Sequence, residues 1–313
     1  MNYAVLFPGQ GAQRPGMGLT FKEKYAVSAR VFEEADDALG YKLSDMIFNG
    51  TPEQLAQTEI TQPATLTMSI AAFRAAQEEA DGRLTPFCMA GHSLGEYTAA
   101  VASGMLSLSD GVRLVRFRGQ LMQKAQPAGT TSMLAVIGLQ LDEVMAVCKQ
   151  AEEGQVCVPA NINQPEQIVI GGHVEALARA EKIIKENYGA RVVPLRVSTA
   201  SHCILMKPVA EQLKEEFKKL EWKTPCCPIV SNAEAKMNTN PEEVCRALYE
   251  QTFSPVLWVQ NVLEMQRAGV EHYIEFGPAS VLSGLVRKIL KGNRPVAVSV
   301  ADDIPAAMEI IKS

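Results

Sequence analysis

A serine between two glycines, in the run Gly91-His92-Ser93-Leu94-Gly95, is the strongest chemical signal in this sequence. The pattern glycine–x–serine–x–glycine is typical of a nucleophile elbow, which lies between an apolar strand and a helix, and both are predicted here. Small residues on either side let the strand and the helix approach, so the hydroxyl of Ser93 is exposed at the turn. The helix N-terminus directs free N–H groups to the same place. We therefore expect Ser93 to be a nucleophile and the backbone N–H of Leu94 to help bind an oxyanion.

A serine hydroxyl is a weak nucleophile and needs a base, and the sequence has four histidines. His92 is adjacent to the serine and ordinarily cannot fold back to its hydroxyl, and His173 begins a predicted helix. His202 follows a predicted strand, at the kind of strand end where the catalytic loops of α/β folds gather. His272 lies beside a late strand, where the base would stand in a hydrolase with the chain order Ser, Asp, His. The residues favour His202 and leave His272 as the alternative.

A second glycine-rich turn, Pro8–Gln13, comes directly after the first apolar strand. It lacks the third glycine and the acidic residue of a dinucleotide-binding fingerprint, and no Gly-Lys-Ser/Thr follows as in a P-loop. A turn at this strand end would lie at the same edge of the sheet as Ser93. Its backbone N–H groups could therefore supply a second oxyanion donor, and a purely structural turn is the alternative.

The elements that must position these residues alternate between strand and helix, which predicts a parallel sheet covered by helices on both faces. The predicted strands are 3–7, 86–90, 228–230, 272–275 and 295–299. The predicted helices are 21–39, 61–80, 96–104, 109–124, 206–219, 241–251, 255–267, 279–290 and a terminal helix from 303.

The middle of the chain has a different order of elements. Strands are predicted at 132–138, 156–161, 167–170 and 191–197, with helices at 142–151 and 174–188. This β-α-β-β-α-β order is that of a ferredoxin-like unit. We therefore predict an α/β fold in which a small subdomain, 127–198, is inserted into a larger domain made of 1–126 and 199–313.

Composition excludes several classes of protein. Apolar residues make up 47% and charged residues 21% of the 313 residues, as in ordinary globular proteins. The net charge of −5 disfavours a nucleic-acid binder. No apolar run approaches the roughly 20 residues of a membrane-spanning helix, and the N-terminus lacks the features of a signal peptide. The seven cysteines show no Cys-x2-Cys spacing, so we expect free thiols in a cytoplasmic protein and no metal site.

The chain contains several spaced motifs, namely PGQGAQ at 8–13, GHSLGEY at 91–97, Arg118-Gly119, Asn161-Ile162-Asn163, SHCILMKP at 201–208 and Glu275-Phe276-Gly277-Pro278. In this order they resemble a known family, the malonyl-CoA:acyl carrier protein transacylases. The likeness runs in order from about residue 3 to about residue 290. It implies a hydrolase-like α/β domain with a parallel-sheet core and an inserted ferredoxin-like subdomain, which agrees with the pattern of elements.

The resemblance also implies roles for matching residues. Ser93 would be the acylated nucleophile and His202 its base, which decides against His272. The backbone N–H groups of Gln10 and Leu94 would form the oxyanion hole. Arg118 would hold the malonyl carboxylate, and Gln251, which matches a family glutamine near the site, would be a second substrate-binding residue. In this family backbone carbonyls orient the base, so no catalytic aspartate is expected.

An arginine suits this chemistry because a guanidinium is always charged and can grip a carboxylate through two parallel hydrogen bonds. The implied reaction is ping-pong transfer of a malonyl group from malonyl-CoA to the phosphopantetheine thiol of acyl carrier protein, in fatty acid biosynthesis. No cofactor is needed, and a monomer is expected. The alternatives are a free-standing acyltransferase of a polyketide assembly line and a serine hydrolase that clears acyl thioesters; Arg118 argues against the hydrolase.

Two further expectations concern partners and specificity. Acyl carrier proteins are typically acidic, so a basic docking surface is expected. Two basic groups of residues are candidates, namely Lys182, Lys185 and Arg191, and Arg287, Lys288, Lys291 and Arg294. The loop 199–202 departs from the Phe-His ending of many malonyl-specific relatives, which leaves tolerance for methylmalonyl groups open.

Overall fold

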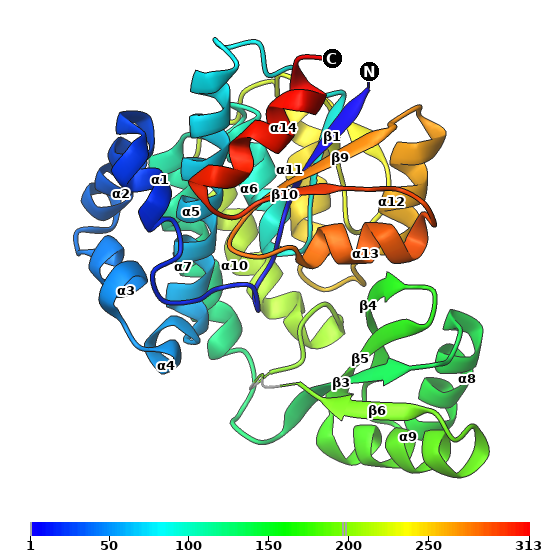
Figure 1. Cartoon of the computed structure of the whole chain (residues 1–313). Coiled ribbons are helices and arrows are strands. Elements are labelled where there is room, and N and C mark those ends of the chain that lie inside the picture. Colours follow the sequence, from blue (N-terminus) through cyan, green and yellow to red (C-terminus); the bar gives the residue numbers. More distant parts are fainter. Residues whose placement is uncertain (1, 196, 198) are drawn as a thin grey trace.

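The computed structural model describes residues 2–195, 197 and 199–313. Its larger sheet has six strands in the order β10-β9-β1-β2-β7-β8 (Figure 1). All neighbouring pairs are parallel except β7 with β8. The strands are β1 (Tyr3–Phe7), β2 (Cys88–Gly91), β7 (Ile229–Val230), β8 (Met237–Asn238), β9 (His272–Phe276) and β10 (Val296–Val298).

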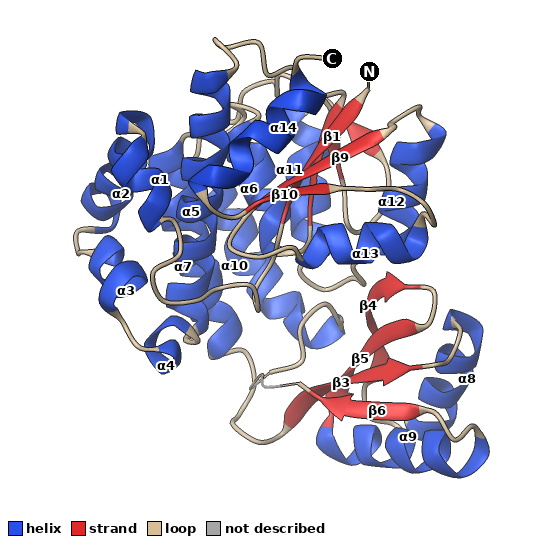
Figure 2. Cartoon of the chain, in the orientation of Figure 1, coloured by secondary structure: helices blue, strands red, loops and turns tan. Residues whose placement is uncertain are grey.

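Helices cover both faces of this sheet (Figure 2). They are α1 (Leu19–Lys24), α2 (Ala26–Leu39), α3 (Leu43–Asn49), α4 (Pro52–Leu55), α5 (Thr58–Glu79), α6 (Leu94–Ala102), α7 (Leu108–Gln123), α10 (Lys207–Phe217), α11 (Pro241–Gln251), α12 (Trp258–Arg267), α13 (Val281–Ile289) and α14 (Ile304–Ile311). Strand β1 shows why two layers form. Its odd-numbered side chains pack into the core with α5, α6 and α7, and the even-numbered Ala4 and Leu6 pack with α12 and α13.

The helices before β2 differ in part from the prediction. The predicted helix 21–39 is divided into α1 and α2 at Tyr25, whose backbone is extended with φ −124° and ψ 119°. The buried Tyr25 side chain donates its hydroxyl hydrogen bond to Glu79 of α5 (3.0 Å), and this tertiary contact has no signature in the local helical pattern. The short elements α3, α4 and β8 were not predicted.

The second sheet is antiparallel and has four strands in the order β4-β5-β3-β6. The strands are β3 (Thr131–Ile137), β4 (Cys157–Gln164), β5 (Gln167–His173) and β6 (Arg191–Pro194), with α8 (Leu141–Ala151) and α9 (Val174–Asn187) packed on one face over a separate core. This β-α-β-β-α-β arrangement is the predicted ferredoxin-like unit, so the predicted fold class is confirmed. Strand β6 ends before the predicted 197; Arg196 and Ser198 lie outside the described residues. The exact boundaries, 127 and 198, stay a prediction.

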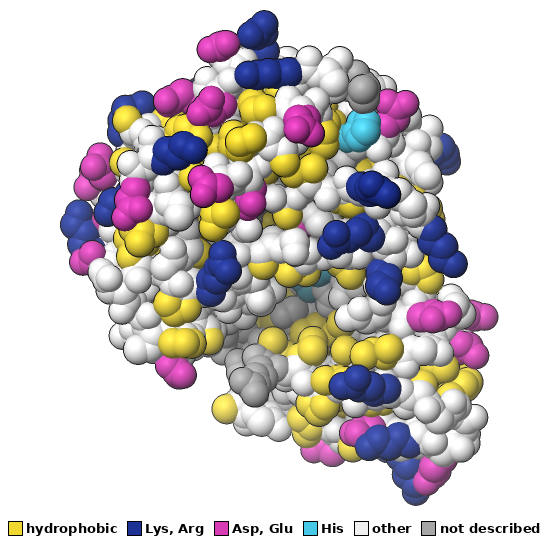
Figure 3. Space-filling model, viewed as in Figure 1, with side chains coloured by type: hydrophobic (Ala, Val, Ile, Leu, Met, Phe, Trp, Pro, Cys, Tyr) yellow, Lys and Arg dark blue, Asp and Glu magenta, His cyan; other side chains and the backbone are white. Residues whose placement is uncertain are grey.

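The two sheets are joined next to a hollow in the surface. Val256, which precedes α12, pairs with β4, since its N–H donates to Ala160 O and its carbonyl accepts from Ile162 N, both at 2.9 Å. Where the chain returns to the larger sheet, the N–H of Ala200 lies 3.2 Å from Gln126 Oε1. Figure 3 shows the hollow between the two parts, with hydrophobic side chains along its lower side.

No helix in the described part of the chain combines the length and the hydrophobicity needed to cross a lipid bilayer. All seven cysteines are free thiols.

Candidate active site

Ser93 stands at a sharp turn between β2 and α6. Its backbone has φ 52° and ψ −104°, a combination that non-glycine residues rarely adopt. The flanking glycines are required by contact. A Cβ on Gly91 would lie 1.9 Å from the carbonyl carbon of Gly95, and a Cβ on Gly95 would lie 1.9 Å from Phe7 O. The steric reason for this motif, inferred from sequence, is therefore present in the structure.

The turn after β1 lies against the turn that carries Ser93. The N–H of His92 donates to Phe7 O (3.0 Å), and a Cβ on Gly9 would come within 2.6 Å of His92 O. Gln10 follows in this turn and is exposed, whereas Leu94 is the buried first residue of α6. The structure thus brings both predicted oxyanion-hole residues to the edge of the sheet where Ser93 lies.

His202 is the histidine that the structure brings to Ser93. Its Nε2 lies 2.8 Å from Ser93 Oγ, and its Nδ1 lies 2.8 Å from the backbone oxygen of Gln251. Because a carbonyl oxygen can only accept, Nδ1 carries the proton and Nε2 is left with a lone pair facing the serine. The ring is 3% exposed, and burial, followed by the charge of Arg118, lowers the pKa of His202 to about 3.

The other histidines have different surroundings. His92 Nε2 lies 2.8 Å from Asn163 Oδ1, and the His92 ring packs on that of Trp258. His173 accepts a hydrogen bond from the N–H of Val156 through Nδ1 (2.9 Å). His272 begins β9 opposite Tyr3, at the end of the sheet away from Ser93. The alternative base, His272, is therefore not brought to the nucleophile.

Arg118 reaches the serine from α7 and is 1% exposed. Its Nη2 donates to Ser93 Oγ (3.0 Å) and to Gln251 Oε1 (3.1 Å), and its Nη1 donates to Gln62 Oε1 (2.9 Å). The guanidinium also lies over the ring of Tyr97, 5.1 Å from its centre. Burial is the main cause that lowers the pKa of Arg118, while Tyr97 and a nearby carboxyl act in the opposite direction. The result is a buried cation beside the nucleophile, held by neutral hydrogen-bond acceptors.

Three residues in this site were missed from the sequence. Gln62, on α5, is fully enclosed and holds Arg118; it had no distinct signal among the other buried polar residues of that helix. Asn232, after β7, accepts from the N–H of Ser93 (2.7 Å). Glu96 is part of the GHSLGEY motif but had no assigned role. It is 0% exposed, and burial raises its pKa to about 7 against the lowering effect of Gln251, Asn232 and Arg118.

The motifs at 161–163 and 275–278 hold neighbouring parts of the fold in place. Asn163, of the Asn161-Ile162-Asn163 run, holds His92 as described above. Glu275 accepts from the backbone N–H groups of Leu282 (3.0 Å) and Ser283 (2.7 Å) and so caps the start of α13.

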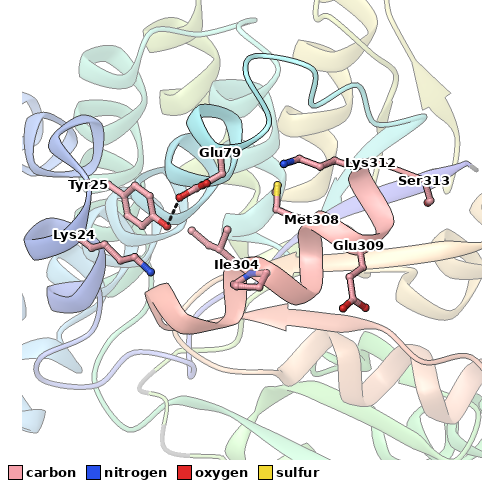
Figure 4. A pocket seen from close by; sticks show the side chains of 9 residues that line it. Lys24, Tyr25, Glu79, Ile304, Met308, Glu309, Lys312 and Ser313 are labelled. Atoms are coloured by element: carbon pink, nitrogen blue, oxygen red, sulfur yellow. Dashed lines mark hydrogen bonds between the residues drawn. The ribbon is translucent and has the colours of Figure 1, made fainter.

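Two hollows elsewhere in the structure lack these groups. A cavity of about 650 Å³ lies between α14 and the ends of α1 and α5, where the hydroxyl of Tyr25 bonds to Glu79 (Figure 4). A second, of about 790 Å³, lies between α10 and α11 and is lined by Trp222 and Tyr249 among others. Neither is lined by Ser93, His202 or Arg118. Within the described residues, no group of three or more His, Cys, Asp or Glu side chains is placed to hold a metal ion.

A parallel α/β sheet with a serine at a strained turn, a neutral histidine at its hydroxyl and backbone N–H groups beside it defines a serine enzyme of acyl transfer or hydrolysis. The comparisons with known proteins narrow this class. The acyl transferase domain family matches residues 5–308. The malonyl CoA-acyl carrier protein transacylase of Escherichia coli is 42% identical over 308 residues, which are 98% of this chain and 99% of the relative.

Solved structures of similar proteins agree with this family assignment. The acyl carrier protein S-malonyltransferase of Vibrio cholerae superposes with a TM-score of 0.94 at 42% identity, over 98% of this chain and 100% of that chain. A malonyl-transacylase solved in complex with a type II PKS acyl-carrier protein gives a TM-score of 0.95 at 40% identity, over 99% and 100% of the chains. This chain belongs to the acyl transferase domain family and, within it, to the malonyl CoA-acyl carrier protein transacylases.

Proposed function

We propose that this protein transfers a malonyl group from malonyl-CoA to the phosphopantetheine thiol of acyl carrier protein, in fatty acid biosynthesis. One observation carries the proposal. The hydroxyl of Ser93 lies between a neutral base, His202 Nε2 at 2.8 Å, and a buried cation, Arg118 Nη2 at 3.0 Å. A serine hydrolase that acts on plain acyl chains needs the base but has no use for a buried cation at the nucleophile.

In the first half-reaction, Ser93 Oγ attacks the thioester carbonyl while its proton passes to His202 Nε2. The carbonyl oxygen becomes an oxyanion, which the N–H groups of Leu94 and Gln10 stabilise. The N–H of Ser93 itself is already bonded to Asn232. The carbon–sulfur bond then breaks, CoA leaves as a thiol with the proton from His202, and malonyl-serine remains.

Arg118 binds the free carboxylate of the malonyl group in this scheme. The bound carboxylate also offsets the positive charge that lowers the pKa of His202. The base therefore becomes easier to protonate when a malonyl group is present, at the moment when it must take the serine proton. A neutral acetyl group brings no such charge, so the preference for malonyl over acetyl groups arises in the acylation rate as well as in binding.

The second half-reaction reverses the first with another thiol. His202 takes the proton of the phosphopantetheine thiol, the sulfur attacks the acyl-serine, and the proton returns to Ser93 Oγ as the ester bond breaks. No cofactor takes part in either step. We propose that the segment 127–198 is an inserted subdomain that forms one wall of the substrate entrance, supported by the hollow in Figure 3. A cytoplasmic location is proposed from the free thiols.

The experiment is intact-mass analysis after brief mixing with malonyl-CoA. We expect a malonyl-sized gain that is discharged on adding holo acyl carrier protein. The gain is absent in Ser93→Ala and retained in Ser103→Ala, a matched control at another buried serine, whose hydroxyl donates to Ala100 O (3.1 Å). No adduct, together with release of free acid from neutral acyl thioesters, would indicate the hydrolase instead.

The choice of carrier tests the pathway. Discharge is compared between a fatty acid carrier protein and a type II polyketide carrier protein, because a similar transacylase is known in complex with the latter kind. We expect the fatty acid carrier to discharge the adduct faster, and faster discharge by the polyketide carrier would reassign the pathway without changing the chemistry.

A further inference from the structure

Glu96 is a buried carboxyl that no step of the proposed mechanism uses. It lies on α6, three residues after Ser93, and is 0% exposed. Burying a carboxyl is unfavourable unless hydrogen bonds satisfy it. Its partners therefore indicate what it does.

One oxygen of Glu96 joins two distant parts of the chain. Its Oε2 accepts from the backbone N–H of Asn232 (3.0 Å), which follows β7, and from Nε2 of Gln251 (2.9 Å), at the end of α11. Its other oxygen, Oε1, has no hydrogen-bond partner among the described residues. The contacts thus depend on an acceptor at one position and make no use of the second oxygen.

The two residues that Glu96 joins hold the two backbone polar groups of Ser93. The N–H of Ser93 donates to Asn232 Oδ1 (2.7 Å), and Gln251 Nε2 donates to the carbonyl oxygen of Ser93 (2.8 Å). The Asn232 carboxamide also donates to Gly91 O (2.7 Å), so it spans the turn. These bonds act on a residue with φ 52°, which needs such support to persist.

Gln251 connects the same carboxyl to the base and the cation. Its backbone oxygen accepts from His202 Nδ1 at 2.8 Å, and its side-chain oxygen accepts from Arg118 at 3.1 Å. Because Nε2 of Gln251 is directed at Glu96 and Ser93, the side-chain oxygen is left to face Arg118. A shift of Gln251 would therefore move nucleophile, base and cation relative to one another.

We infer that Glu96 is a positioning residue for acyl transfer: its Oε2 atom fixes Asn232 and Gln251, and these hold the hydroxyl of Ser93 between His202 and Arg118. The role belongs to the acceptor atom and its position, and the negative charge is not required. The inference rests on the proposed function, since it assigns how the reactive serine of that function is kept in place.

Two substitutions separate position from charge. Glu96→Gln keeps an oxygen acceptor at the same distance from the backbone and removes the charge. Glu96→Asp keeps the charge and withdraws both oxygens by one methylene. We expect the maximal rate of Ser93 acylation in Glu96→Gln to stay within about threefold of the wild type, and that in Glu96→Asp to fall about tenfold to a hundredfold, as small displacements of reacting groups do.

The rates are measured in single turnovers with two reagents, malonyl-CoA and a neutral fluorophosphonate that reacts with serine. The amplitude gives the folded, reactive fraction, so that a loss of stability is separated from a loss of rate. Both reagents should show the Glu96→Asp defect, and the half-saturating concentration of malonyl-CoA should change less than about threefold because Gln62 still holds Arg118.

Asp36→Asn is the matched control. Asp36 is also a buried carboxyl, 4% exposed, and it accepts from the N–H (2.8 Å) and the hydroxyl (2.7 Å) of Ser44 on the far side of α5. Its substitution should lower the melting temperature and leave both acylation rates unchanged. Asn232→Ser provides a second test if Glu96→Asp does not fold: it removes the carboxamide and should slow both reagents about tenfold.

The outcomes are distinguishable. Slower acylation in Glu96→Gln than in Glu96→Asp would mean that the charge matters and would overturn the inference. Wild-type rates in Glu96→Asp would also overturn it. If Glu96→Asp is unfolded, wild-type rates in Asn232→Ser would overturn it instead. A control that loses rate as much as Glu96→Asp would also overturn it. If wild-type protein reacted with the fluorophosphonate but not with malonyl-CoA, the proposed function would fail, and the phosphonate rates would still decide the inference.

Discussion

Replacing Arg118 with alanine should separate recognition of the malonyl carboxylate from acylation itself. The side chain is 1% exposed and donates to Ser93, Gln62 and Gln251. In Arg118→Ala, a bound malonyl carboxylate would be enclosed without a charged partner. An acetyl group has no carboxylate, so it escapes that loss.

The magnitude follows from the burial of the pair. Truncating one partner of a buried, hydrogen-bonded charge pair costs about 2–5 kcal/mol. At about 1.4 kcal/mol for each factor of ten, kcat/KM for malonyl-CoA should fall roughly 30-fold or more. The charge of Arg118 also lowers the pKa of His202, second only to burial, so its removal leaves a better base. Acetyl transfer should therefore fall much less, so the malonyl-to-acetyl ratio should drop, by about 30-fold or more if acetyl transfer does not change.

The assay is acylation of Ser93 by malonyl-CoA and acetyl-CoA, each measured well below the melting temperature of the variant. Arg113→Ala is the control on the same helix, because Arg113 is exposed and its ion pair with Asp110 (2.7 Å) is remote from the serine. The control should keep the wild-type ratio. Equal losses of malonyl and acetyl transfer in Arg118→Ala would refute the role of Arg118 in binding the malonyl carboxylate.

Four other predictions concern the base, the elbow and the docking surface. His202→Ala should slow acylation about a hundredfold or more. Burial holds the pKa of His202 at about 3 in the fold against 6.5 for the free side chain. The contribution of neutral His202 to stability is therefore complete above pH 6.5 and is lost as the pH falls toward 3. Between pH 6.5 and pH 4, the urea midpoint of His202→Gln should fall less than that of the wild type. Gly95→Ala places a Cβ 1.9 Å from Phe7 O and should lower the melting temperature by about 10 °C or more, as thermal unfolding would show. Arg287→Glu, in the last turn of α13, should slow transfer to acyl carrier protein but not to free pantetheine. Lys182→Glu should affect neither transfer, because Lys182 already lies 3.9 Å from a carboxylate. Equal effects of Arg287→Glu on both acceptors would argue against docking at α13.

Much of the fold was predictable because its signals are local. The apolar runs at β1 and β2 and the periodic helices α7 and α9 follow from residues within a few positions of one another. The order of elements was enough to predict the inserted ferredoxin-like unit. Where the prediction was wrong, at Tyr25, the buried side chain bonds to Glu79 on another helix, a contact that the local helical pattern does not signal.

The candidate site was predictable only in part. The elbow around Ser93 has a local signature in its Gly-x-Ser-x-Gly run between a strand and a helix. Gly91 is required by contact with Gly95, four positions later, whereas Gly95 is required by contact with Phe7 on another strand. The residues alone left His202 and His272 as competing bases; the family resemblance favoured His202, and the structure places it at the serine. Gln62 had no distinct signal, because its helix α5 carries several other polar residues, such as Thr61 and Thr65, that are equally buried.

What the sequence by itself determined is the set of reactive groups and the elements that carry them, since strand, turn and helix formation depend mainly on neighbouring residues. The tertiary structure decided which groups meet. Ser93 and His202 are 109 positions apart, and Ser93 and Asn232 are 139 apart. Hydrogen bonds over such separations leave no local pattern, because they form only after the parallel sheet and its helices have packed. The physical reason is that the chemistry of Ser93 depends on distances of about 3 Å, which burial in a close-packed interior fixes and a sequence pattern does not.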